Sequence, residues 1–142
     1  MSYLYNLVYV SHRLPSCNEE EIQKILTTSR KNNQKKDITG VLLHSKNRFL
    51  QYLEGNKEEL LSVYERIAKD KRHSKCSMLY HVPIPHRVFP SWQMGYKDLD
   101  HELNFQTEAG EAEYTIFHQL IEEDAYKDIE GLHILKIFFE RV

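Results

Sequence analysis

The order of patterned segments along the chain restricts its fold more than any other feature of the sequence. Segments rich in aromatic and β-branched residues alternate with segments whose apolar residues recur at helical spacing. Strands are expected at 3–11, 37–45, 48–55, 76–84 and 93–99, and helices at 18–33 and 56–70. The order βαββαββ predicts an α+β fold of the ferredoxin-like kind, with both helices on one face of an antiparallel sheet.

The expected strands are apolar on both faces. In the first strand Leu7 and Tyr9 share one face, and two valines occupy the other. Such a sheet must be covered on both sides. Apolar stripes near the carboxyl end predict further helices that pack on the second face. We therefore expect a core at 1–100 and a helical extension at 101–142 within one domain unit.

Composition excludes several classes of function. The 142 residues are enough for one domain, and 19 basic against 21 acidic residues favour neither nucleic acid nor an anionic membrane as a partner. No apolar run approaches the roughly 20 residues of a membrane span, and no signal peptide begins the chain, so a cytoplasmic location is expected. The two cysteines and eight histidines lack the paired spacing of metal ligands, and we expect no metal site.

Polar residues interrupt apolar patterns where a core is expected. The apolar stripe of each helix ends in polar side chains, at Ser29, Asn32 and Asn33 in the first helix and at Arg66 and Asp70 in the second. In the strand "RFLQYLEG", Gln51 shares a face with Phe49 and Leu53. All of these side chains are expected to point into the region between the two helices.

Each polar residue also has an ordinary explanation. Asn32 and Asn33 can end a helix, and Arg66 and Asp70 can form an exposed pair one turn apart. Gln51 can pair with backbone at a sheet edge, and the hydroxyl of Tyr9 can find a local partner. Together they indicate more, because a buried amide without a partner costs about 1–3 kcal/mol. The convergence predicts a polar ligand, and a flat heteroaromatic ring with carbonyl and N–H groups suits amides well.

Five stretches of the chain resemble a known family. The stretches "LVYVS", "NNQKKDITGVL", "FLQYLEG", "VYERIAKDKRH" and "PIPHRVFPSWQM" have the order and spacing of a BLUF domain, a blue-light sensor that uses flavin. The resemblance covers about residues 3–98. It implies a ferredoxin-like domain with a flavin held between its two helices. The flavin is usually FAD, and FMN and riboflavin are alternatives.

The resemblance also implies roles for individual residues. The photoactive tyrosine falls on Tyr9, the switch glutamine on Gln51, and the relay pair of the last strand on Trp92 and Met94. The side chains implied to bind the flavin are Tyr9, Ser29, Arg30, Asn32, Asn33, Gln51, Arg66, Asp70, Arg72, His73 and Met94. Among them, Asn33 matches the asparagine that binds a flavin ring carbonyl. Arg30, Arg72 and His73, together with Lys31, lie where a basic side chain can meet ribityl or phosphate groups.

The family mechanism explains why an amide stands at position 51. Excitation moves an electron and a proton from Tyr9 toward the flavin. Both return after the Gln51 amide has rotated or tautomerised, which leaves a new hydrogen bond to the ring and a small red shift of the absorption. Only about 40 residues follow the core. The chain therefore resembles short stand-alone sensors, which are oligomeric and pass a signal to a separate protein.

Two other functions fit the same fold. A small acyl phosphate hydrolase can use an arginine and an asparagine, such as Arg66 and Asn33, although no glycine-rich anion loop accompanies them. A light-insensitive module can keep the scaffold to bind another ligand. We expect a sensor without enzymatic activity. A yellow protein whose spectrum shifts reversibly in blue light separates this function from both alternatives.

Overall fold

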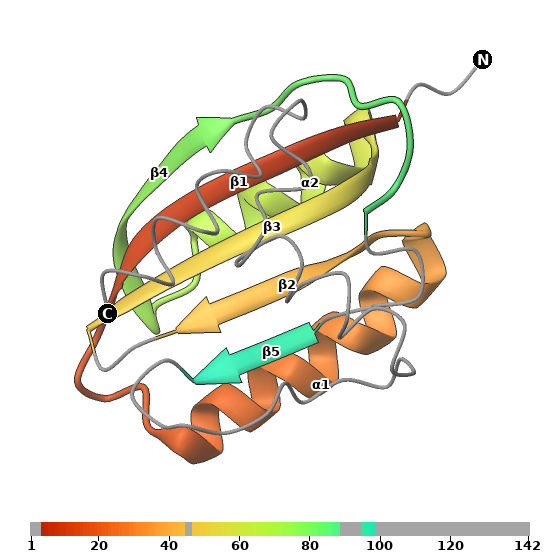
Figure 1. The fold of residues 1–142 in the computed structure, drawn as a ribbon. Coiled ribbons are helices and arrows are strands. Elements are labelled where there is room, and N and C mark those ends of the chain that lie inside the picture. The colour runs from red at the N-terminus through yellow and green to blue at the C-terminus, as the bar shows by residue number, and fades with distance from the viewer. Residues whose placement is uncertain (1–3, 45–46, 89–94, 99–142) are drawn as a thin grey trace.

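The computed structural model describes residues 4–44, 47–88 and 95–98, and in this part of the chain the order of elements is βαββαββ. The elements are β1 (Leu4–Arg13), α1 (Glu19–Lys36), β2 (Thr39–His44), β3 (Arg48–Asn56), α2 (Lys57–Ala68), β4 (His73–Tyr80) and β5 (Gly95–Asp98). One sheet has the strand order β4-β1-β3-β2-β5, and both helices lie on the same face of it (Figure 1). The expected ferredoxin-like α+β fold is confirmed.

The sheet is mainly antiparallel. β1 pairs with β3 and β4, and β3 pairs with β2, all antiparallel, whereas β5 runs parallel to β2. β1 and β3 therefore occupy the interior of the sheet, where both of their faces can be covered. Leu7 and Leu53 are fully buried on the face toward the helices, and Val8 and Leu50 are fully buried on the opposite face. The two-sided apolar pattern of the sequence is borne out in these strands.

Helix α1 continues past the asparagines that offered a place for it to end. Asn18 caps its start by accepting a hydrogen bond from the N–H of Glu21 at 3.0 Å. The helix ends only at Lys36, because Asp37 adopts a left-handed conformation, with φ of 55°, and its N–H bonds to the carbonyl of Asn33. The interpretation of Asn32 and Asn33 as a helix stop is therefore wrong, and both side chains belong to the last turns of a regular helix.

Strand β4 is displaced from its expected range. It begins at His73 instead of Cys76 and ends at Tyr80. Pairing with β1 brings His73 opposite Arg13, and two register shifts let the strand follow β1. Pro83 lacks the N–H that a continuing ladder requires and forms only an isolated bridge with Tyr5.

Several expectations concern residues outside the described part of the chain. They are the helical extension at 101–142 and the placement of Trp92 and Met94. The division into a core and an extension thus stays a prediction. Among the described helices, none combines the length and apolar character needed to cross a membrane.

Candidate functional site

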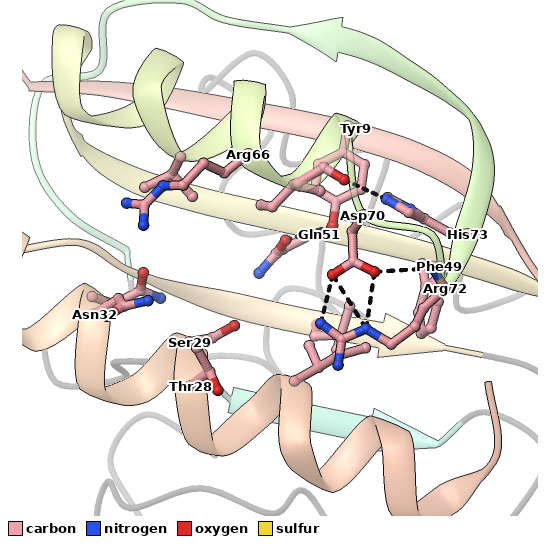
Figure 2. A pocket seen from close by; sticks show the side chains of 15 residues that line it. Tyr9, Thr28, Ser29, Asn32, Phe49, Gln51, Arg66, Asp70, Arg72 and His73 are labelled. Carbon is pink, nitrogen blue, oxygen red and sulfur yellow. Dashed lines mark hydrogen bonds and ion pairs between the residues drawn. The ribbon is translucent and has the colours of Figure 1, made fainter.

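A pocket of about 220 Å³ lies between α1 and α2, above the faces of β1, β2 and β3 that the helices cover. Figure 2 shows Arg66 and Asn32 at one end of it and the Asp70–Arg72 pair at the other, with Gln51 between them. Its volume approaches the range of small-molecule sites, roughly 300–1,000 Å³. The two helices thus leave room for a ligand at the place where their apolar stripes become polar.

The pocket collects nearly all described residues that the sequence pointed to. Those that line it are Tyr9, Ser29, Asn32, Asn33, Gln51, Arg66, Asp70, Arg72 and His73. Arg30 and Lys31 do not line it, because they follow Ser29 on α1 at angles that turn them from the pocket side of the helix. Met94 lies outside the described residues.

Other lining residues were not predicted as site residues, although the sequence placed Phe49 on the same strand face as Gln51. They are Thr28, beside Ser29 on α1, and the apolar residues Ile25, Leu42, Phe49, Val63 and Ile67. Helical spacing from Asn32 reaches Thr28 and Ile25, so periodicity held a signal for these two. Leu42 enters through its pairing opposite Gln51, which depends on the strand register. The pocket therefore combines an apolar wall with polar groups from both helices and the sheet.

The central polar contact joins two neighbouring strands. Tyr9 and Gln51 are direct partners in the β1–β3 ladder, and the Tyr9 hydroxyl donates to Gln51 Oε1 at 2.6 Å. Each residue is only 4 % exposed. β3 lies between β1 and β2, so the interpretation of Gln51 as an edge residue is wrong. The partner of the Tyr9 hydroxyl is also not local, because it comes from a strand 42 residues away in the chain.

Tyr9 is held as a neutral donor. Burial raises the pKa of its hydroxyl well above the usual 10.0, and the nearby Cys76, Asp70 and Tyr64 raise this pKa further. The ring of Tyr64 meets the Tyr9 ring edge-on, with 5.8 Å between centroids. With its proton in place the Tyr9 hydroxyl can donate, and in this arrangement it donates to the amide oxygen of Gln51.

His73 is fixed by both ring nitrogens. Nε2 lies 2.6 Å from the carbonyl oxygen of Ile67, and Nδ1 lies 2.7 Å from Ser11 Oγ. A carbonyl can only accept, so Nε2 carries a hydrogen, and in the neutral ring Nδ1 accepts from the serine hydroxyl. The ring stands edge-on to that of Tyr9, with 6.3 Å between centroids. His73 therefore forms part of the wall beside the tyrosine.

Asp70 pairs with Arg72, so the interpretation of Asp70 as the partner of Arg66 in an exposed pair is wrong. Arg72 Nη2 lies 2.5 Å from Asp70 Oδ2, and Arg72 Nε donates to Oδ1 at 2.9 Å. The Arg72 backbone N–H also donates to Oδ1, at 2.9 Å. Arg72 Nη1 lies 3.6 Å from Glu21 Oε2 on α1. This chain of charges connects the loop after α2 to the first turn of α1 at one end of the pocket.

Acid is expected to weaken this end of the pocket. The Arg72 hydrogen bonds hold the pKa of the Asp70 carboxyl below its usual 3.8, against the opposing effect of partial burial. A carboxyl with a lowered folded-state pKa contributes stability above its unfolded pKa and loses it as the pH falls through the folded one. Asp70→Asn is expected to reduce the loss of thermal stability on acidification below about pH 5. The difference in acid-induced destabilisation between Asp70→Asn and the wild type should stay under about 1 kcal/mol, because the Asp70–Arg72 pair is partly exposed.

The control for this experiment is Glu65→Gln, which removes an exposed carboxylate from α2. Melting temperatures of both variants and the wild type are compared across the acid range. Equal acid sensitivity of Asp70→Asn and the wild type would contradict the assignment.

The fold and the pocket together define a ferredoxin-like domain with a ligand-sized pocket, lined by polar and apolar side chains, between its two helices. The chain belongs to the BLUF family. The family model described as "Sensors of blue-light using FAD" matches residues 4–95. Blue-light sensing and FAD as the cofactor, both implied by the resemblance, are confirmed by this membership.

Relatives with curated functions match the same part of the chain. A photoactivated adenylate cyclase subunit beta from Euglena gracilis is 34% identical over 88 residues, which are 62% of this chain and 10% of that protein. The blue light- and temperature-regulated antirepressor BluF from Escherichia coli is 31% identical over 96 residues, 68% of this chain and 24% of that protein. The chain thus spans only about a tenth to a quarter of the length of these relatives.

Solved structures agree with the fold. The photo-activated state of BlsA is 28% identical, with a TM-score of 0.66, and the alignment covers 96% of this chain and 92% of that one. The dark state of the BLUF protein BlrB gives a TM-score of 0.71 over 99% of this chain and 95% of that one, at 23% identity.

The residues of the pocket fit a flavin. Asn33 and Gln51, with exposed fractions of 3 % and 4 %, bring amides to a site whose wall contains Leu42 and Phe49. Amides can both donate and accept, as carbonyl and N–H groups on one ring edge require.

No group of three or more potential ligands that could hold a metal ion occurs among the described residues.

Proposed function

We propose that this chain senses blue light through a hydrogen-bond switch formed by Tyr9 and Gln51. A bound flavin supplies the absorption of blue light and ring atoms whose hydrogen bonding tunes that absorption. The observation that carries the proposal is the 2.6 Å bond from the Tyr9 hydroxyl to Gln51 Oε1 inside the pocket. The experiment is a difference spectrum of the purified protein, dark against illuminated, in which a reversible red shift is expected.

The switch uses the two ends of one amide. In the arrangement described, Gln51 presents its oxygen to Tyr9. On illumination Tyr9 would give one electron and its hydroxyl proton to a bound flavin, and this transfer would remove the donor that holds the Gln51 amide in place. The amide then rotates or tautomerises, and Tyr9 regains both. Exchanging donor and acceptor at Gln51 rewires the polar contacts of the pocket without moving the backbone.

Other pocket residues hold the ligand. We propose that Asn32, Asn33 and Ser29 bind its polar edge from α1 and that Arg66, Asp70, Arg72 and His73 do so from the opposite side. The relay roles of Trp92 and Met94 stay predictions. For Arg30 the support is weaker, because its side chain does not line the pocket.

Replacing Tyr9 by phenylalanine is expected to preserve flavin binding and to abolish the normal photocycle. The ring keeps its place in the core, whereas the hydroxyl that donates to Gln51 is lost. The measurement is the flavin content and the light-induced difference spectrum of the variant. Tyr64→Phe is the matched control, because it removes a hydroxyl from the neighbouring ring. A normal red shift in Tyr9→Phe would contradict the role of Tyr9.

We propose further that the signal passes to a downstream protein and that the chain itself is oligomeric and not an enzyme. The names of the relatives point to different outputs, an adenylate cyclase in one case and an antirepressor in another. The identity of the downstream protein and a cytoplasmic location stay predictions from the sequence. Size-exclusion chromatography in the dark and under blue light tests the oligomeric state.

A further inference from the structure

Polar side chains cluster on the face of the sheet opposite the pocket. Glu54 is fully buried there, on the same strand as Gln51 but on its other side. Its two carboxylate oxygens accept from the N–H of Val88 at 3.0 and 2.8 Å, and Oε2 also accepts from the Tyr52 hydroxyl at 3.1 Å. Glu54 therefore fixes the backbone at Val88, next to Arg87.

Arg87 joins three parts of the fold. Its Nη1 donates to Thr39 Oγ1 at 2.8 Å and to the carbonyl oxygen of Glu54 at 3.1 Å, and its Nη2 donates to the carbonyl oxygen of Asp37 at 2.6 Å. The Asp37 carboxylate, 93 % exposed, lies 3.3 Å from Nη2. A planar guanidinium presents five N–H donors at fixed angles, whereas the lysine ammonium has three donors on a flexible stem. The side chain thus ties the start of β2, the end of β3 and the cap of α1 together.

One peptide group connects Arg87 to the pocket. The carbonyl of Asp37 accepts from Arg87, and the N–H of the same peptide unit, that of Ile38, donates to the carbonyl oxygen of Asn33 at 2.9 Å. The unit is planar, so the two bonds hold it from opposite ends. It must be held, since Asp37 has φ of 55°, which residues other than glycine adopt at a cost. Asn33 is buried and lines the pocket.

We propose that Arg87 is a positioning residue for the flavin pocket. From the far side of the sheet it fixes the Asp37–Ile38 peptide. This peptide bonds to the backbone carbonyl of Asn33 and so holds the last turn of α1, which carries the Asn33 side-chain amide into the pocket. Its effect on flavin binding rests on the proposed role of Asn33 as a flavin contact. Its effect on the cap of α1 does not depend on flavin.

The test compares Arg87→Met with the wild-type chain by two measurements. Hydrogen–deuterium exchange of the Ile38 amide is expected to accelerate about tenfold or more, because its local opening no longer requires the guanidinium bonds to break. The Kd for FAD is expected to rise about tenfold. The amides of Val8 and Leu53, in the interior of the sheet, serve as an internal reference for overall stability. The control is His86→Ala, which alters an exposed neighbour in the same loop and is expected to change neither value.

Two further variants sharpen the test. Asp37→Asn removes the exposed carboxylate but keeps the carbonyl and tolerates the left-handed conformation, so Ile38 exchange is expected to stay within about twofold of the wild type. Arg87→Lys keeps the positive charge but lacks the planar guanidinium. Its Ile38 exchange rate and its Kd for FAD are expected to lie between those of the wild type and Arg87→Met. It also provides the comparison if Arg87→Met fails to fold.

Unchanged exchange of Ile38 relative to the internal reference in the Arg87 variants would overturn the proposal. An equal acceleration of Ile38 exchange in Asp37→Asn would also overturn it, because the ion pair between Arg87 and the Asp37 carboxylate would then account for the effect. If the wild-type chain binds no flavin, the proposed function fails, and Ile38 exchange still decides whether Arg87 positions the end of α1.

Discussion

Gln51→Leu is expected to retain flavin and to lose the light-induced red shift. Leucine is close in size to glutamine and fits between Phe49 and Leu53 on the covered face of β3, so the pocket keeps its shape. Leucine offers no hydrogen-bond donor and no acceptor, so the variant lacks the amide whose rotation or tautomerisation forms the proposed switch. The measurement is the dark and illuminated absorption spectrum of the purified variant. An undiminished red shift would remove Gln51 from the mechanism.

The same substitution is expected to lower stability. It leaves the hydroxyl of Tyr9, which is 4 % exposed, without the acceptor at 2.6 Å, at a cost of about 1–3 kcal/mol. Adding Tyr9→Phe removes the hydroxyl that has lost its acceptor, so the double variant should recover part of the lost stability. The control for the spectrum is Asn32→Leu, which removes an amide from the same pocket without touching the Tyr9–Gln51 bond. It is expected to weaken flavin binding and to keep the shift.

Gly40→Ala is expected to have the largest effect on folding. A β-carbon at this position of β2 would stand 2.0 Å from the backbone oxygen of Tyr52 and 3.0 Å from the α-carbon of Leu53. Both contacts are with the backbone of β3, so the strands must separate to admit it. The expected loss is roughly 3 kcal/mol in the free energy of unfolding, at the upper end for overpacking. Urea unfolding followed by circular dichroism measures it.

Gly55→Ala is the matched control, since it adds the same methyl group to the neighbouring strand. There the closest atom is Cγ1 of Ile38, at 3.1 Å, so a shift of a few tenths of an ångström would relieve the contact. We expect a loss below about 1.5 kcal/mol, as for well-tolerated changes of core volume. Equal losses in the two variants would show that β2 and β3 adapt at Gly40. Such a result would contradict the expected clash.

The sequence predicted the elements better than their ends. Strand and helix periods located β1, β2, β3, α1 and α2 within a few residues, because each buries one or two regular faces. The ends were less accurate where backbone geometry decided them. A left-handed Asp37 ends α1 beyond the asparagines, and pairing with β1 starts β4 at His73.

The sequence alone therefore determined the order of the elements, the two-sided burial of the central strands and the set of polar residues that interrupt their patterns. Only the tertiary structure decided how those residues pair. Tyr9 meets Gln51 through the β1–β3 register, and Asp70 binds Arg72 instead of Arg66. The tertiary structure also revealed Arg87, whose acceptors come from the cap of α1, from β2 and from β3. The physical reason is that periodicity arises from neighbours along the chain, whereas hydrogen bonds between distant residues depend on strand register and helix packing.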